Sequence, residues 1–355
     1  MGTKEEIKNS IGFDLGGTSL KFGFGNSREG LLYFDTIYHE EKSLDSLIKT
    51  FKEAFEKCKS EFGVRSSEFG NPNTELLTLG IATPGIVDDK NGIILGSTPN
   101  LPFLKGLNLK NLLQEITQLP VFIENDANLM TLGEAFYENS KSLLGITIGT
   151  GIGTGFVEAQ QKPHPFLFPT STNKKPIGDW HYRGEAEYSE LRTQNSELLY
   201  SYSLLKGESN LAMEAGHIIV VPNGRLCLCG KKGCLEAYAS AESIKRIISE
   251  KYPEFKGMSI NSILLQKDSN IQKAVLEQLE LLAIGIANII VILNPEVVAI
   301  GGGMIENENF DFTYLKNQVL KNLSTDYHKV NIKKAIQGNK AGVIGAIIFS
   351  EISNY

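Results

Sequence analysis

Three of the four cysteines in this 355-residue chain lie close together, at Cys227, Cys229 and Cys234, and His217 stands ten residues before the first of them. Three thiols and one imidazole form a complete tetrahedral ligand set for zinc, which prefers sulfur and nitrogen ligands. The glycines between the last two cysteines suit a chain that folds back around an ion. We therefore predict a metal site here, and we call residues 214–240 the zinc knot.

Asp126 is a second candidate for chemistry. It follows the expected buried strand Val121–Ile123 and stands at the start of an expected helix, Ala127–Tyr137. A carboxylate held at such a place suits a catalytic base. The same place also suits an N-cap, which accepts hydrogen bonds from the first N–H groups of a helix, so both roles stay open. Two more carboxylates, Glu214 and Glu236, lie within the zinc knot on either side of its histidine and cysteines, where a metal would hold them in fixed positions.

Two glycine-rich turns each join a pair of alternating apolar segments. Ser10–Gly25 and Leu143–Val157 both read as β-hairpins, and backbone N–H groups in such turns can converge on phosphate. A plain hairpin is the alternative for the first. The pattern GxxxxGK[ST] is absent, and the glycines of the second turn do not fit GxGxxG, which disfavours P-loop and dinucleotide-binding folds. Two similar units suggest a duplicated nucleotide-binding architecture.

A third glycine group, residues 301–303, follows the expected buried strand Glu296–Ile300. Bare backbone there suits either the approach of a nucleotide base or ribose, or close packing of a helix on a strand. Residues 158–212 are the least regular part of the chain and contain its only tryptophan, Trp180. They suit a lid, an oligomer contact or a surface excursion, and a structural or interface role is favoured. Apolar spacing predicts helices over 43–62, 108–118, 241–251, 271–293 and 342–353.

Composition narrows the class of protein. The chain is 41% hydrophobic with a formal net charge of −6, which argues against nucleic acid and anionic membranes as partners. The opening residues are polar, unlike a signal peptide, and the longest apolar run, Leu281–Leu293, is too short to span a bilayer. Only Cys58 lies outside the zinc knot, so we expect reduced thiols and a cytoplasmic protein.

In this order, these motifs resemble the ROK family (repressor, open reading frame, kinase), part of the superfamily that joins sugar kinases, actin and the heat-shock chaperone ATPases. DLGGT at Asp14–Thr18, followed by Lys21, is similar to the first phosphate motif of the family. GTGIGTG at Gly149–Gly155 is similar to its second, and NPEVVAIGGGM at Asn294–Met304 to its adenosine motif. The zinc segment Gly216–Glu236, GHx9CxCGxxGCxE, is the most specific signature. The resemblance covers nearly the whole chain except residues 158–212.

The resemblance implies an α/β protein with the two-domain actin-like, ribonuclease-H-like sugar kinase fold and an active-site cleft between the domains. It implies a small N-terminal domain, 1–124, completed by a C-terminal helix, 341–355. The large domain, 125–340, would contain the zinc motif and an insertion at about 158–212. A homodimer or homotetramer is also implied.

The implied function is an ATP-dependent hexose kinase that uses Mg²⁺, contains a structural Zn²⁺ and transfers the γ-phosphate to the 6-hydroxyl of glucose. Asp126 would be the base, Asp14 would lie near Mg²⁺ and the phosphates, and His217 would use one ring nitrogen for zinc and the other for the sugar. The implied sugar-binding residues are Gly85, Asn100, Asn125, Asp126, Glu214, His217 and Glu236. The implied residues for the nucleotide and Mg²⁺ are Asp14, Gly16, Gly17, Thr18, Lys21, Gly149, Thr150, Gly151, Gly301, Gly302 and Gly303.

Other functions fit part of the same pattern. The sugar could be fructose, mannose, N-acetylmannosamine or N-acetylglucosamine. A sugar-responsive repressor, the other branch of the family, would carry a helix-turn-helix domain ahead of the first phosphate motif, where thirteen residues precede Asp14. The sequence Met213-Glu214-Ala215-Gly216-His217 departs from the usual GEIGH or GELGH, and residues 158–212 are longer than the usual connection. Both departures bear on the choice of sugar, and the second bears also on the oligomeric state.

Overall fold

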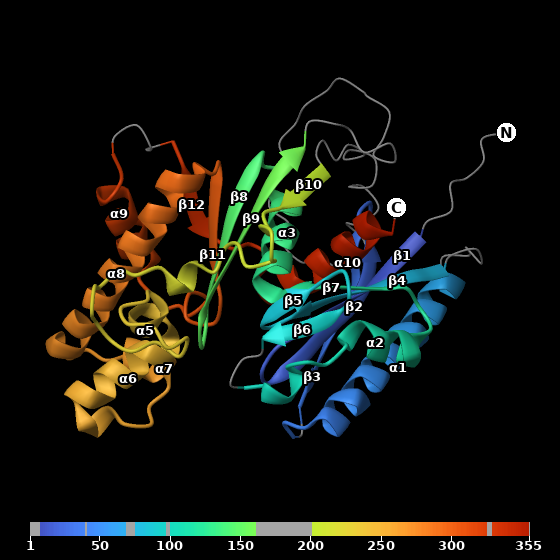
Figure 1. The fold of residues 1–355 in the computed structure, drawn as a ribbon, viewed down its shortest axis with the longest axis horizontal. Coiled ribbons are helices and arrows are strands. Elements are labelled where there is room, and N and C mark those ends of the chain that lie inside the picture. Colours follow the sequence, from blue (N-terminus) through green and yellow to red (C-terminus); the bar gives the residue numbers. More distant parts are fainter. Residues whose placement is uncertain are drawn as a thin grey trace.

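The computed structural model describes residues 8–39, 41–68, 75–96, 100–160, 201–324 and 329–354. Its two five-stranded sheets have the orders β3-β2-β1-β4-β7 and β10-β9-β8-β11-β12 (Figure 1). In each sheet, three antiparallel strands are followed by two strands that run parallel to the first. The two halves therefore share one topology, as the two glycine turns suggested, and the predicted α/β two-domain architecture is confirmed.

The elements of the first half are β1 (Lys8–Leu15), β2 (Ser19–Asn26), β3 (Gly30–Tyr38), α1 (Leu44–Glu68), β4 (Glu75–Thr83), β5 (Ile86–Asp88), β6 (Ile93–Gly96), α2 (Leu109–Thr117) and β7 (Val121–Asn125). The chain continues through α3 (Asp126–Glu138), β8 (Ser142–Ile148), β9 (Ile152–Gln160), β10 (Ser201–Leu204), α5 (Glu236–Ala239), α6 (Ala241–Lys251), α7 (Ile260–Leu264), α8 (Ser269–Leu293), β11 (Val297–Gly301), α9 (Phe312–Lys321), β12 (Asn331–Lys334) and α10 (Ala341–Ser353).

Each half provides a helix that packs on the sheet of the other half. α3 follows β7 of the first sheet but packs on β8 and β9, whereas α10 follows β12 of the second sheet but packs on β1 and β4. The two helices meet at Gly133 and Gly345. A Cβ on Gly133 would overlap the carbonyl oxygen of Ala341, and one on Gly345 would overlap that of Leu129. Only glycine allows the two helices to approach this closely.

Two hydrophobic cores support the sheets. The first contains Phe13, whose ring stacks on that of Phe51 of α1 with the centroids 5.9 Å apart. The second surrounds α8, whose side chains Leu282 and Ile286 are buried in it. By length and composition α8 could cross a membrane, but 56% of its most apolar window is buried inside the protein. Packing in this core accounts for its hydrophobicity.

Two predictions about chain organisation remain predictions. The packing of α10 on β1 and β4 supports the assignment of residues 1–124 and the C-terminal helix to one domain. Within the range 158–212, the described ends form the last residues of β9 and all of β10, which pair in the second sheet. Trp180 and the rest of residues 161–200 lie outside the described residues, and so does the question of a lid or oligomer contact.

Candidate active site

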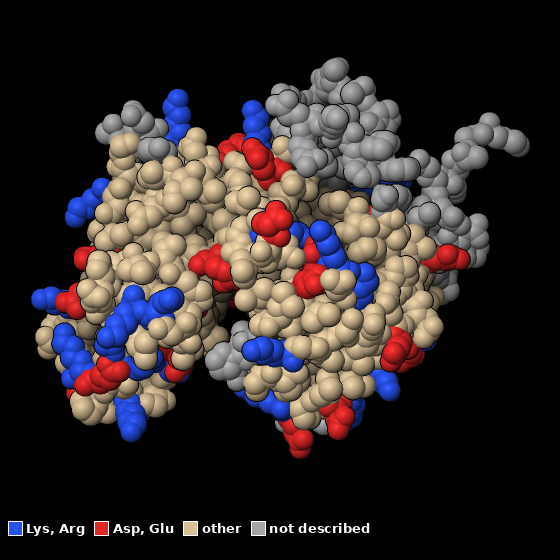
Figure 2. Space-filling model, in the orientation of Figure 1, with Lys and Arg blue, Asp and Glu red and all other residues tan. Residues whose placement is uncertain are grey.

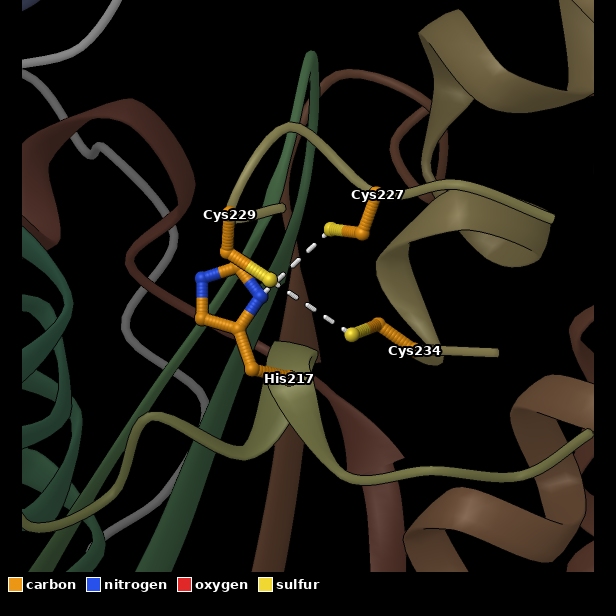
Figure 3. Close-up of side chains that lie close together, drawn as sticks. All are labelled: His217, Cys227, Cys229 and Cys234. Atoms are coloured by element: carbon orange, nitrogen blue, oxygen red, sulfur yellow. Dashed lines mark hydrogen bonds between the residues drawn. The ribbon is translucent and has the colours of Figure 1, made fainter. Parts of the chain in front are cut away.

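The four predicted zinc ligands point toward one another (Figure 3), and their ligand atoms all lie within 4.8 Å of one another. Cys227 Sγ lies 3.6 Å from His217 Nδ1, and Cys229 Sγ lies 3.6 Å from Cys234 Sγ. Two ligands of one tetrahedral zinc ion, at ordinary bond lengths, stand about 3.6–3.8 Å apart. The cluster is therefore consistent with a structural zinc site of one imidazole and three thiolates.

The backbone of the zinc knot folds back as its glycines require. Gly230 and Gly233 have φ angles of 84° and 88°, in the left-handed region. The carbonyl oxygen of Gly233 accepts hydrogen bonds from the N–H groups of Val220 and Val221, at 2.9 and 3.2 Å. These bonds place the segment of His217, which ends the short 3-10 helix Ala215–His217, beside the cysteines.

The zinc knot also contacts the second glycine turn. Glu236 Oε2 accepts a hydrogen bond from the N–H of Ile152 at 2.9 Å, and a Cβ on Gly151 would lie 2.6 Å from the same oxygen. Directly after the knot, the N–H of Ala241 donates to the carbonyl oxygen of Gly149 at 2.9 Å. A predicted sugar ligand and a predicted phosphate turn are thus held in direct contact.

Asn125, rather than Asp126, is the N-cap of α3. Its side-chain oxygen accepts from the N–H groups of Ala127 at 2.9 Å and Asn128 at 3.3 Å, and its Nδ2 donates to the Gly85 carbonyl oxygen at 3.0 Å. Asp126 is the first residue of the helix, and its Oδ1 also accepts from the N–H of Ala127 at 2.9 Å. The N-cap interpretation of Asp126 was therefore wrong, whereas two of the predicted sugar-binding residues, Asn125 and Gly85, are in contact.

The surroundings of Asp126 make its carboxyl a weaker acid than an ordinary aspartate. Burial, followed by the negative charge of Asp14 and more weakly that of Glu214, raises the pKa of the Asp126 carboxyl to about 6, against the opposing hydrogen bond from Ala127. General bases act most efficiently when their pKa lies near the working pH. The carboxylates of Asp14 on β1 and Glu214 in the zinc knot are therefore close enough to Asp126 on α3 to affect its ionisation.

The first glycine turn adjoins the ion pair of Asp14 and Lys21 and the side-chain amide of Asn100. Asp14 Oδ2 accepts from Lys21 Nζ at 3.2 Å, and a Cβ on Gly342, at the start of α10, would lie 2.7 Å from Asp14 Cγ. A Cβ on Gly17 would lie 3.1 Å from the Cβ of Asn100, so this predicted sugar-binding residue adjoins the phosphate turn. Thr18, at the tip of the turn, is exposed.

One contact of the first turn was missed from the sequence. His39 Nε2 lies 3.1 Å from the carbonyl oxygen of Gly16, and the N–H of His39 donates to the carbonyl oxygen of Thr18 at 3.0 Å. His39 follows β3, a strand that the sequence patterns did not predict, so no local signal placed it near the turn.

The second turn and the third glycine group lie together. Gly302 has a φ of 98°, and a Cβ there would lie 2.5 Å from the carbonyl oxygen of Ile148, at the end of β8. Close packing thus explains Gly302. A Cβ on Gly149 or on Gly303 would meet no atom of the described residues within 4 Å, and Thr150 is exposed. These backbone positions leave room for a ligand to approach, while Gly301 ends β11.

The ribbon and the surface show where these elements meet. β1–β7 with α1 and α2 form one lobe, and β8–β12 with α5–α9 form the other (Figure 1). The surface is hollowed between the two lobes (Figure 2). Each lobe carries one of the two glycine turns, at the end of the hairpin β1–β2 or β8–β9. Asp126 begins α3, the helix that follows the last strand of the first sheet and leads to the second.

A model of the ROK family matches residues 10–164 and 199–351. A glucokinase from Thermotoga maritima is 27% identical over 95% of both chains, and an N-acetyl-D-glucosamine kinase from Aliivibrio fischeri is 30% identical over 94% of this chain and 97% of the relative. The crystal structure of a ROK family glucokinase from Streptomyces griseus, in complex with glucose and AMPPNP, superposes with a TM-score of 0.70 at 22% identity, covering 97% of this chain and 99% of that one.

The chain therefore belongs to the ROK family, as a sugar kinase. Its pair of mixed five-stranded sheets is the actin-like fold of ROK kinase structures. The family model passes over residues 165–198, which fall within the stretch that the sequence marked as irregular.

Proposed function

We propose that this protein is an ATP-dependent hexose kinase that transfers the γ-phosphate of ATP to the 6-hydroxyl of glucose. The observation that carries the proposal is the placement of Asp126, whose pKa is raised to about 6 by burial and by the nearby Asp14 and Glu214. A carboxylate with this pKa can accept the proton of a sugar hydroxyl near neutral pH. Both relatives named above are sugar kinases.

In the proposed reaction, Asp126 takes the proton of the 6-hydroxyl while the hydroxyl oxygen attacks the γ-phosphorus. The bond from that phosphorus to the β–γ bridging oxygen breaks, and ADP leaves with its electron pair. Phosphoryl transfer depends mostly on positioning and on neutralising charge. The N–H of Gly16 already donates to the carbonyl oxygen of Ser19, and that of Gly149 to the carbonyl oxygen of Gly151. We therefore propose that the remaining N–H groups of the two glycine turns supply the fixed positive dipoles. Gly149 and Gly303 leave open space on the second sheet.

Asp14 is the residue proposed to hold Mg²⁺ near the phosphates. Its carboxylate adjoins the first glycine turn, its side chain is 15% exposed, and a carboxylate oxygen suits this hard cation. When bound, Mg²⁺ neutralises phosphate charge. Lys21, 3.2 Å from Asp14, can add a second positive charge on the same side.

The zinc knot is proposed to bind Zn²⁺ and to present sugar ligands. His217 turns Nδ1 toward the cysteine sulfurs, which leaves Nε2 for a sugar hydroxyl. Glu214 precedes His217 and Glu236 follows Cys234, so both carboxylates are anchored by the same metal site. Four protein ligands fill a tetrahedral zinc ion, which makes its role structural. On the other side of the sugar we place Asn100, Asn125 and Gly85. Zinc binding requires reduced thiols, which supports a cytoplasmic enzyme.

N-acetylglucosamine is the second candidate substrate. The relative from Aliivibrio fischeri, an N-acetyl-D-glucosamine kinase, favours it at 30% identity. Met213, directly before Glu214, has a φ of 67°, a left-handed conformation that is uncommon for a residue with a side chain. Its position beside a predicted sugar ligand makes the pocket wall here a feature that could select among sugars.

The experiment is a coupled assay of ADP release with Mg-ATP and, in turn, glucose, mannose, fructose, N-acetylmannosamine and N-acetylglucosamine. We expect the highest kcat/KM with glucose. A higher kcat/KM with N-acetylglucosamine would replace glucose with the second candidate. Absence of turnover with all five sugars would overturn the proposed activity.

A further inference from the structure

Lys206 joins two carboxylates of the first half although it belongs to the second. It follows β10, and its Nζ lies 2.6 Å from Asp89 Oδ2 and 2.5 Å from Glu124 Oε2. The same ammonium group stands 4.9 Å from the ring centroid of Phe349 on α10. The Lys206 side chain is only 22% exposed. It therefore occupies a largely enclosed place between the two lobes.

A second contact fixes the segment that carries Lys206. Asn210 Nδ2 donates to Asp89 Oδ1 at 2.9 Å and to the carbonyl oxygen of Val87 at 3.1 Å. Both acceptors belong to the β5–β6 hairpin and its connection. Lys206 and Asn210 thus attach residues 205–212 to this hairpin at two points, so that the ammonium group has a defined position.

Glu124 connects Lys206 to the catalytic end of α3. The side chain of Glu124 is 3% exposed, and the residue directly precedes Asn125 and Asp126. Its Oε1 accepts from the N–H of Asn125 at 2.8 Å and from Nδ2 of Asn128 at 3.1 Å. Its Oε2 faces Lys206. One carboxylate therefore holds the N-cap of α3 with one oxygen and pairs with a cation through the other.

A buried carboxylate needs such a cation. Without a positive partner, an ionised carboxylate in a dry environment either takes up a proton or turns toward water. Either change would weaken the hydrogen bond that Glu124 makes to the N–H of Asn125. Because Asn125 caps the helix and Asp126 is its first residue, the position of the proposed base would loosen with it.

We propose that Lys206 is a positioning residue for the phosphoryl transfer: by neutralising Glu124 it fixes Asn125 and Asp126 at the start of α3. Lys206 acts through Glu124 and contacts neither reacting group. This proposal rests on the proposed role of Asp126. It adds a requirement that the second lobe, through residues 205–212, be docked on the first for the base to be in place.

The test compares steady-state kinetics of four proteins on the best sugar: wild type, Lys206→Met, Glu124→Gln/Lys206→Met, and the control Lys245→Met. Lys245 forms a surface ion pair with Glu242 at 2.7 Å, away from α3. We expect kcat of Lys206→Met to fall about 10- to 100-fold, because small misplacements of a reacting group cost rates of that order. KM for the sugar and for ATP should change by less than about threefold, as expected when substrate binding is preserved.

The double variant separates positioning from folding. Glutamine needs no counter-charge and still accepts from Asn125, so Glu124→Gln/Lys206→Met should regain at least about fivefold in kcat over Lys206→Met, a non-additivity that signals coupling of the two residues. A kcat of Lys206→Met within about twofold of the control would overturn the proposal, since independent surface changes are nearly neutral. A kcat of the double variant no higher than that of Lys206→Met would overturn it too.

Two further measurements keep the outcomes distinct. Asp126→Asn is assayed in parallel: if it turns over like wild type, the proposed base is wrong, whereas an inactive Asp126→Asn with a normal Lys206→Met removes only the positioning role. If Lys206→Met does not fold by circular dichroism, Lys206→Gln replaces it, because it removes the positive charge beside Glu124 while its amide can still donate to the carboxylates of Asp89 and Glu124. We expect a lower kcat at unchanged KM for that variant, and a wild-type kcat would overturn the proposal.

Discussion

The two halves of the molecule share a strand order but supply charge to their glycine turns in different ways. The first turn receives Asp14 and Lys21 from its own strands, β1 and β2, where they pair at 3.2 Å. The second turn, between Ile148 and Ile152, has no charged residue of its own and receives the carboxylate of Glu236 from the zinc knot. Both halves provide backbone N–H groups at their turns. In the second half, the zinc knot adds the carboxylate that the strands beside the turn do not supply.

The helices α3 and α10, which each pack on the sheet of the other half, are also alike in placement but different in the residues at their N-termini. α3 and α10 each pack on the sheet of the opposite half and cross at a pair of glycines. The start of α3 carries Asp126, while the start of α10 places Gly342 against the side chain of Asp14. Equivalent helix N-termini therefore approach one region, and only one of them carries the proposed base. This asymmetry can be tested at individual residues.

The largest effect is expected from Asp126→Asn. The variant keeps the shape of the side chain but removes the proton acceptor, so kcat should fall by about 10²- to 10⁴-fold, the usual contribution of general base catalysis. Sugar binding, measured by calorimetry, should change little. The control is Asp311→Asn at the N-cap of α9, where asparagine caps equally well. A near-normal kcat in Asp126→Asn would remove this residue from the role of base.

Cys229→Ser tests whether the zinc knot of the second half needs its metal ion for activity. Loss of one of four zinc ligands should release zinc and reduce activity by at least about tenfold, because ligand and supporting-shell changes typically cost that much. Zinc content is measured by atomic absorption alongside the kinase assay. Cys58→Ala, a buried cysteine of the first half outside the cluster, should leave the zinc content unchanged. Activity that persisted after the zinc was lost would make the knot a structural clip alone.

How far the sequence predicts this molecule depends on how local each feature is. The zinc cluster and the two hairpin turns are set by residues close in sequence, and their spacing predicted them. The strands β3 and β12 were missed. Along β3, residues are only partly buried, and β12 is the short polar stretch NIKK, so neither shows clear alternation. Lys206 gave no signal, because its partners Asp89 and Glu124 are brought to it only by the tertiary fold.

The crossing of α3 and α10 should be sensitive to a single methyl group in either half. Gly133→Ala and Gly345→Ala would each place a Cβ on a backbone carbonyl oxygen of the other helix. We expect each to lower the free energy of unfolding by about 1–3 kcal/mol, the usual cost of overpacking, measured by urea denaturation. Gly63→Ala on α1 is the matched control: its methyl group would meet no atom of the described residues within 4 Å, so it should be stabilising by about 0.4–1 kcal/mol. Equal stability of all three variants would contradict the close crossing.

The smallest expected effect is the pH dependence of activity and of stability that arises from the ionisation of Asp126. Because burial and Asp14 raise the pKa of its carboxyl to about 6, kcat/KM should rise about tenfold between pH 5 and pH 7 as the base ionises. The raised pKa also means that the folded state binds this proton more tightly than the unfolded chain, whose carboxyl titrates near 3.9. The stabilisation from this group is therefore fully present below about pH 4 and is lost as the pH rises through about 6.

Asp126→Asn isolates that contribution, since asparagine does not titrate. We compare the melting temperature of the variant with that of wild type at each pH. The variant's melting temperature minus that of wild type should be larger at pH 8 than at pH 4.5, and it should increase as the pH rises through about 6. Differential scanning calorimetry of both proteins at matched ionic strength gives the two curves. A difference in melting temperature that stayed constant from pH 4.5 to pH 8 would show that Asp126 is not held against its own charge. The start of α3 would then carry its base without the destabilisation that the nearby charges of Asp14 and Glu214 predict.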